Sequence, residues 1–342
     1  MIIDGREIGP HRPPYIIFEA SCNHGGSFEN AIKLIRTAKD VGADAIKFQC
    51  YEADTITIDH DGSDFIIKDG LWKGRKLHEL YSKTQTPFAW METLFGYARS
   101  IGITPFASVF DRSSVDLLEQ LDCPAYKIAS MEITDTNLIE YTAQTGKPLI
   151  ISTGMARTIE IEDALVTITP SSRSYGTALL HCVSGYPTRI SDFSLWQLRD
   201  LHQIYGRMYG DNCAIGISDH TIGDAIPIAA TAVGACIIEK HGMLGIEDTE
   251  DYEFSMDPIQ FKMMVREVRN IWQAMQPAKS DAEEPSRQLR RSLYVVKDIQ
   301  AGEKFTEENV RSIRPAYGME PRKLPWVLTK IAAQDLKRGT AL

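Results

Sequence analysis

The sequence predicts an α/β protein, a (β/α)8 TIM barrel followed by a small β-rich domain, and three observations support this prediction. Apolar, β-branched runs recur through residues 15–241, with amphipathic segments between them. The runs are continuous rather than alternating, as in strands that are buried on both faces. Nearly every run ends in polar side chains, including lysine, serine and histidine. A parallel barrel has its active site at these C-terminal strand ends. A doubly wound open sheet is the alternative, but no GxGxxG motif follows the first run.

The expected strands and helices follow one another in order along the chain. Strands are expected at residues 15–22, 45–51, 104–110, 125–130, 149–154, 178–184, 214–220 and 235–241. Helices are expected at residues 28–41, 88–100, 136–145, 159–169, 194–205, 222–234 and 259–275. Eight such units fit one closed barrel, in which the C-terminal ends of all the strands meet at one rim.

One connection between a strand and the next helix is much longer than the others. Residues 52–85 replace a loop that typically has about 2–6 residues. They include the aromatic and basic stretch DFIIKDGLWKGRKLHELY. An insertion on the catalytic face of a barrel usually covers or selects a substrate, which is our expectation here. An insertion that serves only decoration or dimer formation is the alternative.

Three regions are expected in the domain organisation. Residues 1–275 form the barrel, and the proline-bearing, charged stretch QPAKSDAEEPSRQ at residues 276–288 is a linker. Residues 289–342 form the β-rich module. So short a module has little core of its own. We therefore expect it to pack on a barrel, either its own or a partner's.

Composition and charge narrow the range of functions. The chain has 342 residues and a net charge of −9, from 37 basic and 46 acidic residues, which argues against nucleic-acid binding. No signal peptide begins it and no apolar run approaches the ~20 residues of a membrane helix, so a cytoplasmic protein is expected. The six cysteines form neither CxxC nor a zinc spacing and are expected to serve packing.

Two histidines, His220 and His241, end consecutive expected strands. Neutral imidazole suits manganese, iron, cobalt or zinc. Two histidines with no evident third protein ligand would leave an open site that water and substrate oxygens complete, as for a Lewis acid. The alternative is that each histidine is a packed, hydrogen-bonded residue. Their matched placement favours the metal site.

Other strand ends predict an anion site and an acid/base group. Two lysines and three serines are expected to converge on the rim, and phosphate is the ligand that such a site predicts. A lysine there can also form a Schiff base, but the histidine pair argues against that chemistry. Glu132 is the acid/base candidate. The spacing predicts a metal-assisted enzyme with a phosphorylated substrate and leaves the reaction open. The residues of the anion site are Lys47, Lys127, Ser108, Ser130 and Ser218.

Several motifs in register resemble a known family, the sialic acid synthases, which condense phosphoenolpyruvate with an amino sugar. These motifs are FEASCNHGGS, GADAIKFQ, YKIASMEI, ISTGMA, HCVSGYPT, GISDHT and EKH. The tail SLYVVKDIQAGEKFTEENVRSIRP is similar to the antifreeze-like (SAF) domain of that family. The resemblance covers nearly the whole chain. The insertion and the stretch EDTEDYEFSMD resemble the pseudaminic acid subgroup most closely.

The resemblance implies a reaction and its alternatives. Phosphoenolpyruvate would join 2,4-diacetamido-2,4,6-trideoxy-altropyranose and water, giving pseudaminic acid and phosphate by C–O bond cleavage. Synthesis of N-acetylneuraminate or legionaminate by the same chemistry is the first alternative. A non-catalytic carbohydrate-binding protein is the remote one.

The resemblance also assigns roles to residues. His220 and His241 match metal ligands, with manganese expected and magnesium or cobalt as alternatives, and Glu132 matches the acid/base. Arg314 matches an arginine that one subunit of a domain-swapped homodimer places over the active site of the other. The residues implied to bind the two substrates are Glu19, Lys47, Gln49, Ser108, Lys127, Ser130, Ser184, Tyr186, Ser218 and Asp251.

Three positions depart from the pattern of the family. Ser184 stands where N-acetylneuraminate synthases have asparagine, which leaves its phosphate contact open. Val109 replaces a proline, with little expected effect. Gly242 follows the second metal histidine where phenylalanine is common, and the two interpretations of this change are a wider pocket and no consequence.

Overall fold

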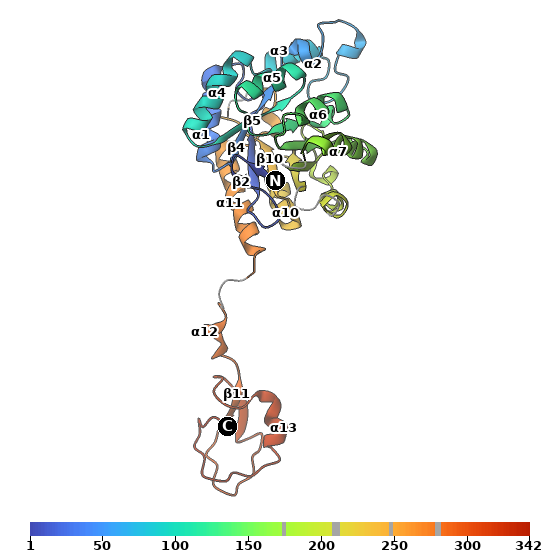
Figure 1. Cartoon of the computed structure of the whole chain (residues 1–342). Coiled ribbons are helices and arrows are strands. Elements are labelled where there is room, and N and C mark those ends of the chain that lie inside the picture. The colour runs from blue at the N-terminus through green and yellow to red at the C-terminus, as the bar shows by residue number, and fades with distance from the viewer. Residues whose placement is uncertain (173–175, 207–212, 246–248, 278–281) are drawn as a thin grey trace. The chain divides into compact units, whose positions relative to one another are not determined.

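The structure is a computed structural model that describes residues 1–172, 176–206, 213–245, 249–277 and 282–342. The chain forms two compact units, Met1–Gln276 and Pro277–Leu342 (Figure 1). The barrel chemistry expected from the sequence lies in the first unit, and the second unit is described separately below.

Eight parallel strands close the barrel in the order β10-β3-β4-β5-β6-β7-β8-β9. All eight expected strands are present, so the predicted fold class is confirmed. Most of them end one to three residues earlier than expected, because the last residues of the expected ranges belong to the loops. The strands are β3 (Tyr15–Glu19), β4 (Ala45–Cys50), β5 (Thr104–Val109), β6 (Tyr126–Ile128), β7 (Leu149–Ser152), β8 (Thr177–Cys182), β9 (Cys213–Asp219) and β10 (Ile237–His241).

The strand register brings residues that are far apart in sequence to one rim. His241 pairs with Glu19 across β10 and β3, and Glu19 pairs with Lys47 across β3 and β4. Ser108 pairs with Lys127 across β5 and β6. Because the parallel strands close on themselves, the order of the strand ends along the chain becomes their order around the pocket.

Helices surround the barrel (Figure 1). The helix at residues 112–120 was not predicted; Asp111 caps it by accepting a hydrogen bond from Ser114 N at 2.9 Å. The helix expected at 194–205 ends early and continues as a π turn, His202–Gly206. The helices are α1 (Phe28–Asp40), α4 (Phe88–Ser100), α5 (Arg112–Gln120), α6 (Thr136–Ala143), α7 (Thr158–Ser172), α8 (Leu195–Leu201), α10 (Ala225–Val233) and α11 (Pro258–Ala274).

The insertion at residues 52–85 is structured. It contains α2 (Ala53–Ile56), a 3-10 turn (Ser63–Phe65) and α3 (Leu77–Thr84). Ion pairs from Lys76 tie its two arms together, at 2.5 Å to Asp59 and 2.7 Å to Asp61. The sequence indicated the length of this connection but not its helices.

A short N-terminal hairpin, β1 (Ile2–Ile3) and β2 (Arg6–Glu7), was also not predicted. Its Ile3 is fully buried in the main core. The carboxylate of Asp44 joins the hairpin to α11, because it forms ion pairs with Arg6 and, at 2.6 Å, with Arg269.

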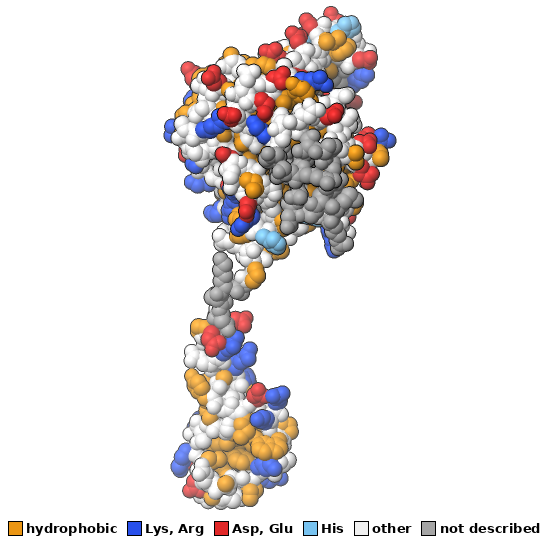
Figure 2. Space-filling model, viewed as in Figure 1, with side chains coloured by type: hydrophobic (Ala, Val, Ile, Leu, Met, Phe, Trp, Pro, Cys, Tyr) orange, Lys and Arg blue, Asp and Glu red, His pale blue; other side chains and the backbone are white. Residues whose placement is uncertain are grey.

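The second unit has little regular secondary structure. It contains α12 (Glu284–Arg287), β11 (Ser292–Val295), β12 (Val310–Ile313) and α13 (Leu324–Val327). Its separate core consists of Leu293, Val295, Ile299, Val310, Val327 and Ala332. Within the expected linker, α12 is helical and residues 278–281 lie outside the described residues. Figure 2 shows hydrophobic side chains gathered on the visible face of this unit.

None of the helices in the described part of the chain is both long enough and apolar enough to span a membrane.

Candidate active site

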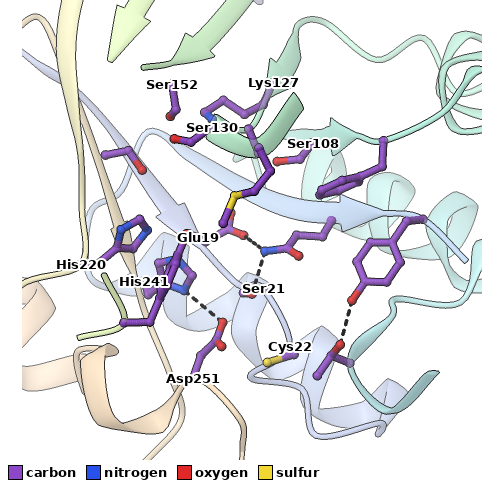
Figure 3. Close-up of a pocket in the computed structure, with 18 of the residues that line it drawn as sticks. Glu19, Ser21, Cys22, Ser108, Lys127, Ser130, Ser152, His220, His241 and Asp251 are labelled. Carbon is purple, nitrogen blue, oxygen red and sulfur yellow. Dashed lines mark hydrogen bonds and ion pairs between the residues drawn. The ribbon is translucent and has the colours of Figure 1, made fainter. Parts of the chain in front are cut away.

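A pocket opens at the C-terminal ends of the barrel strands (Figure 3). All but two of the predicted site residues line it. Ser184 lies just outside the lining, and Arg314 is an exposed residue of the second unit. The predicted residues that the fold brings together are Glu19, Lys47, Gln49, Ser108, Lys127, Ser130, Glu132, Tyr186, Ser218, His220, His241 and Asp251.

Lys47 is at the centre of a buried polar network. Its Nζ lies 2.6 Å from Glu19 Oε2 and 3.7 Å from Glu239 Oε1, and it donates to Ser108 Oγ at 2.9 Å. Burial lowers the pKa of Lys47, but the two carboxylates outweigh burial and raise it above its usual value. Ser218 Oγ donates to Glu239 Oε1 at 2.9 Å. The network therefore favours the charged form of Lys47 in the pocket lining.

Lys127 has no comparable carboxylate partner among the described residues. Its Nζ donates to the carbonyl of Ile128 at 2.9 Å, and its pKa is lowered because burial outweighs the attraction of Glu239. A buried ammonium without a close counter-ion favours an anion that enters beside it. Among the described residues, Lys127 therefore differs from Lys47 in having no close carboxylate that would compete with an entering anion.

Gly154 explains how Ser130 and Ser184 come together. Its N–H donates to Ser130 Oγ at 3.1 Å. A Cβ at this position would lie 2.7 Å from Ser130 Oγ and would overlap Ser184 Oγ. Only glycine leaves both hydroxyls in place, and of the two it is Ser130 that lines the pocket.

Glu132 follows Ser130 in a 3-10 turn, Ser130–Glu132. Burial raises its pKa from the usual 4.5 to about 7, although Lys127 opposes the shift. Its buried Oε2 accepts no hydrogen bond from the part of the chain that the structure describes. A carboxyl group with a pKa near neutrality can both give and take a proton at the pH of a cell.

His220 and His241 face one another, with ring centroids 5.3 Å apart. His220 Nδ1 donates to the carbonyl of Val183 at 3.0 Å, which leaves Nε2 as its lone-pair nitrogen. His241 Nδ1 lies 3.3 Å from Asp251 Oδ2 (Figure 3). A metal-binding histidine commonly has its other nitrogen held in this way, so the pair fits a divalent ion. Among the described residues, no group of three or more potential metal-ligating side chains forms.

Gly242 has a packing role. A Cβ there would overlap the ring of Phe18, whose centroid lies 4.8 Å from that of Phe261 on α11. Gly242 is not among the residues that line the pocket. The interpretation of a widened pocket is therefore wrong: glycine at this position makes room for Phe18.

Some lining residues were not singled out from the sequence. Gln49 Nε2 donates to Ser21 Oγ at 2.8 Å, and Ser21 follows β3 directly. From the insertion, the ring of Trp72 reaches Tyr186, with ring centroids 5.6 Å apart. In the sequence, the unusual length of the insertion was the only indication that it contributes to the pocket. No periodicity marks which loop residues turn inward. The unpredicted lining residues include Ser21, Cys22, Tyr51, Ile56, Ile67, Trp72, Leu80, Tyr81, Phe110, Met131 and Glu250.

Comparisons with known proteins agree with this fold and pocket. The sequence model of the NeuB family matches residues 34–280, and that of the SAF domain matches residues 290–342. The chain therefore belongs to the NeuB family and ends in a SAF domain, which confirms the resemblance and the expected fold of the tail.

Full-length relatives include two pseudaminic acid synthases. That of Campylobacter jejuni is 42% identical over 332 residues, covering 96% of this chain and 95% of that protein. That of Helicobacter pylori is 39% identical over 336 residues, covering 97% of each. The crystal structure of N-acetylneuraminic acid synthetase from Leptospira borgpetersenii, in complex with citrate, has a TM-score of 0.72 and 30% identity, over 84% of this chain and 95% of that chain.

Proposed function

We propose that this protein is a pseudaminic acid synthase. It condenses phosphoenolpyruvate with 2,4-diacetamido-2,4,6-trideoxy-altropyranose and water, releasing phosphate. One observation carries the proposal: a single pocket combines Lys127, Glu132 and the His220–His241 pair in a chain that resembles pseudaminic acid synthases along nearly its full length.

Phosphoenolpyruvate is a small, highly charged anion and fits the polar side of the pocket. Lys127, which has no close counter-ion among the described residues, and Lys47 would bind its phosphate and carboxylate groups. Ser108, Ser130 and Ser218 add hydroxyl donors on the same side. These side chains are buried and held by neighbours, so little reorganisation accompanies binding.

His220 and His241 would hold a divalent metal ion, for which we propose manganese, with magnesium or cobalt as alternatives. When bound, the ion supplies Lewis acidity toward the carbonyl oxygen of the acceptor. Asp251 keeps the His241 ring oriented through its contact at Nδ1. In this chain, Asp251 therefore positions a ligand in addition to lining the pocket.

The reaction is balanced by one molecule of water. C3 of phosphoenolpyruvate forms a bond to the aldehyde carbon, and the aldehyde oxygen takes a proton to become a hydroxyl group. Water adds its oxygen to C2 and loses a proton, and the C2–O bond to phosphate then breaks. Glu132, whose pKa is about 7, is suited to accept the proton of that water, and its charge would stabilise a cationic C2.

The proposal includes a homodimer. The second unit of one subunit would place Arg314 over the pocket of the other, where it would bind a carboxylate and exclude water. In support, exposed hydrophobic side chains accompany the exposed Arg314 on that unit, among them Ile313, Tyr317 and Trp326. Because phosphoenolpyruvate is a cytoplasmic metabolite, we place the protein in the cytoplasm.

Phosphate release tests the proposal. The purified protein is incubated with phosphoenolpyruvate and manganese, with the diacetamido-altrose and N-acetylmannosamine as parallel acceptors. We expect release with the diacetamido sugar. Release with N-acetylmannosamine alone would keep the chemistry but reject the subgroup. No release with these or a legionaminate-type acceptor would favour a non-catalytic carbohydrate-binding protein.

A further inference from the structure

The pocket has a second side, which the binding of phosphoenolpyruvate leaves unexplained. Six side chains from the insertion line it, and five of them are apolar or aromatic and carry no charge. None of these six side chains carries a positive charge that would attract an anion. The lining residues from the insertion are Ile56, Ile67, Trp72, Leu80, Tyr81 and, at its end, Thr84. We call Ile67, Trp72, Leu80 and Tyr81 the insertion wall.

Trp72 connects the insertion wall to the histidine side of the pocket. Its ring centroid lies 5.6 Å from that of Tyr186, and the Tyr186 centroid lies 4.4 Å from that of His220. Tyr186 also contacts Phe254 edge-on, at 5.3 Å. If the carbonyl of the acceptor is bound beside the histidines, the insertion wall would face the rest of the acceptor.

Glu250 holds the insertion wall in place. Arg75 Nη1 lies 2.5 Å from Glu250 Oε2, and Lys83 Nζ lies 2.8 Å from Glu250 Oε1. Arg75 is three residues from Trp72, and Lys83 lies on α3, the helix that carries Leu80 and Tyr81. Burial raises the pKa of Glu250, but the two cations outweigh it and hold that pKa below its usual value. One carboxylate thus holds both ends of the segment 75–83, which contains α3.

The same carboxylate connects the insertion to the metal side. Glu250 directly precedes Asp251, whose Oδ2 contacts His241 Nδ1. Asp251 begins the turn Tyr252–Phe254, and the Phe254 ring lies 4.9 Å from that of His241. A displacement of Glu250 would therefore move the insertion wall relative to the histidine pair.

We propose that the insertion wall selects the acceptor, with Trp72 contacting its methyl groups and Glu250 positioning Trp72 through Arg75 and Lys83. This inference rests on the proposed function. The diacetamido-trideoxy sugar has methyl groups on two acetamido substituents and at C6, whereas N-acetylmannosamine has only one methyl group. Each methyl group in a fitted apolar site changes kcat/KM by about 10–200-fold, which is enough to set a preference.

The first test measures steady-state kinetics of the full-length protein with the diacetamido sugar and two analogues. One analogue has a hydroxyl group at C6 and the other has formyl groups in place of the acetyls. The wild-type protein should prefer the parent sugar to at least one analogue. Trp72→Ala should lower kcat/KM for the parent by about 10–200-fold, mainly through KM, and abolish that preference. The KM for phosphoenolpyruvate should not change, and Trp72→Phe should restore most of the loss.

Two outcomes would overturn the inference: an unchanged preference in Trp72→Ala, or an equal rise of KM for both substrates. If Trp72→Ala does not fold, as judged by circular dichroism, Glu250→Gln decides, because it should raise the acceptor KM and leave the KM for phosphoenolpyruvate unchanged. If the wild-type protein itself releases no phosphate with the diacetamido sugar, the proposed function fails. If the wild-type protein is active and its preference among acceptors is the same in Trp72→Ala, only this inference is rejected.

A double-mutant cycle tests the positioning role of Glu250. Glu250→Gln and Arg75→Gln should each raise the acceptor KM several-fold, about the effect of 1 kcal/mol. The acceptor KM of the double variant should be no higher than that of Glu250→Gln alone, because both substitutions break the same Arg75–Glu250 ion pair. Lys73→Gln is the matched control, since Lys73 pairs with Asp69 at 3.7 Å at an exposed position of the same insertion. Additive effects, or an equal shift in the KM for phosphoenolpyruvate, would contradict the role.

Discussion

The two sides of the pocket are built in different ways. The side for phosphoenolpyruvate comes from barrel strand ends, where Lys47 and Lys127 are buried in a polar network held by neighbouring strands. The insertion wall comes from one long connection, is mainly apolar, and depends on the ion pairs of Glu250. The barrel gives the charged groups fixed positions, whereas the insertion can change in sequence without disturbing them.

This difference has a functional consequence. Groups on closed, hydrogen-bonded strands are held rigidly, as the reacting centre requires. An insertion tied down by a few long-range contacts can acquire a new acceptor preference while the chemistry is retained. Substitutions on the barrel side should therefore affect turnover or phosphoenolpyruvate, and substitutions in the insertion wall should affect the acceptor alone.

The largest effect is expected at Glu132. Glu132→Gln should lower kcat by about 10²–10⁴-fold, because a positioned acid/base is lost. The wild-type kcat should rise with pH through about 7, as Glu132 loses its proton, and the variant should lack that inflection. The exposed Glu140→Gln on α6 is the control. An unchanged pH profile in Glu132→Gln would assign the proton transfer to another group.

The same group makes a prediction for stability. The folded protein keeps the Glu132 proton up to a pKa of about 7, whereas the unfolded chain loses it near 4.5. The folded state therefore binds more protons between these values, and the contribution of Glu132 to the free energy of unfolding should fall as pH rises from about 4.5 to about 7. Denaturant titrations at several pH values measure the free energy of unfolding. Its decrease between about pH 4.5 and about 7 should be smaller in Glu132→Gln than in the wild type.

Lys127→Met should have the next largest effect. Removing one partner of a buried charge–anion contact should lower kcat/KM for phosphoenolpyruvate by about 10²–10³-fold. The preference among acceptors should stay the same, as steady-state kinetics with both substrates varied will show. Lys33→Met, which removes an exposed cation on α1, is the control. A changed acceptor preference in Lys127→Met would show that the two sides of the pocket are not independent.

A smaller effect is expected at Asp251. Asp251→Asn should weaken manganese binding by about 10–100-fold, because the neutral amide supports the His241 ring less well. Calorimetric titration with manganese measures this directly. Glu253→Gln, an exposed change two residues away in the same loop, should bind manganese as the wild type does. Equal affinities in Asp251→Asn and wild type would remove Asp251 from the metal site.

The smallest effect is expected at the edge of the insertion wall. Ile67→Ala should raise the acceptor KM about three- to tenfold through partial loss of apolar contact, with the KM for phosphoenolpyruvate unchanged. Ile58→Ala is matched in size and lies in the same insertion, but Ile58 is 55% exposed and does not line the pocket. If both variants behave alike, Ile67 does not contact the acceptor.

The sequence by itself determined the barrel fold and most of the residues on the polar side of the pocket. Continuous apolar runs identified the strands, and the closed parallel topology converts the order of their ends into spatial neighbours. His220, His241 and Lys127 could be placed together for this reason, before any contact was known. Strand periodicity is a local property, and a short sequence window is enough to show it.

Only the tertiary structure decided what the loops do. Arg75 and Glu250 are separated by 175 positions, and no local pattern indicates that they meet. The same holds for Gly242, since the absence of a side chain there is explained by the ring of Phe18 rather than by the pocket. Loop residues follow no hydrophobic period, so their contacts depend on the packing of distant segments and become visible only in the folded protein.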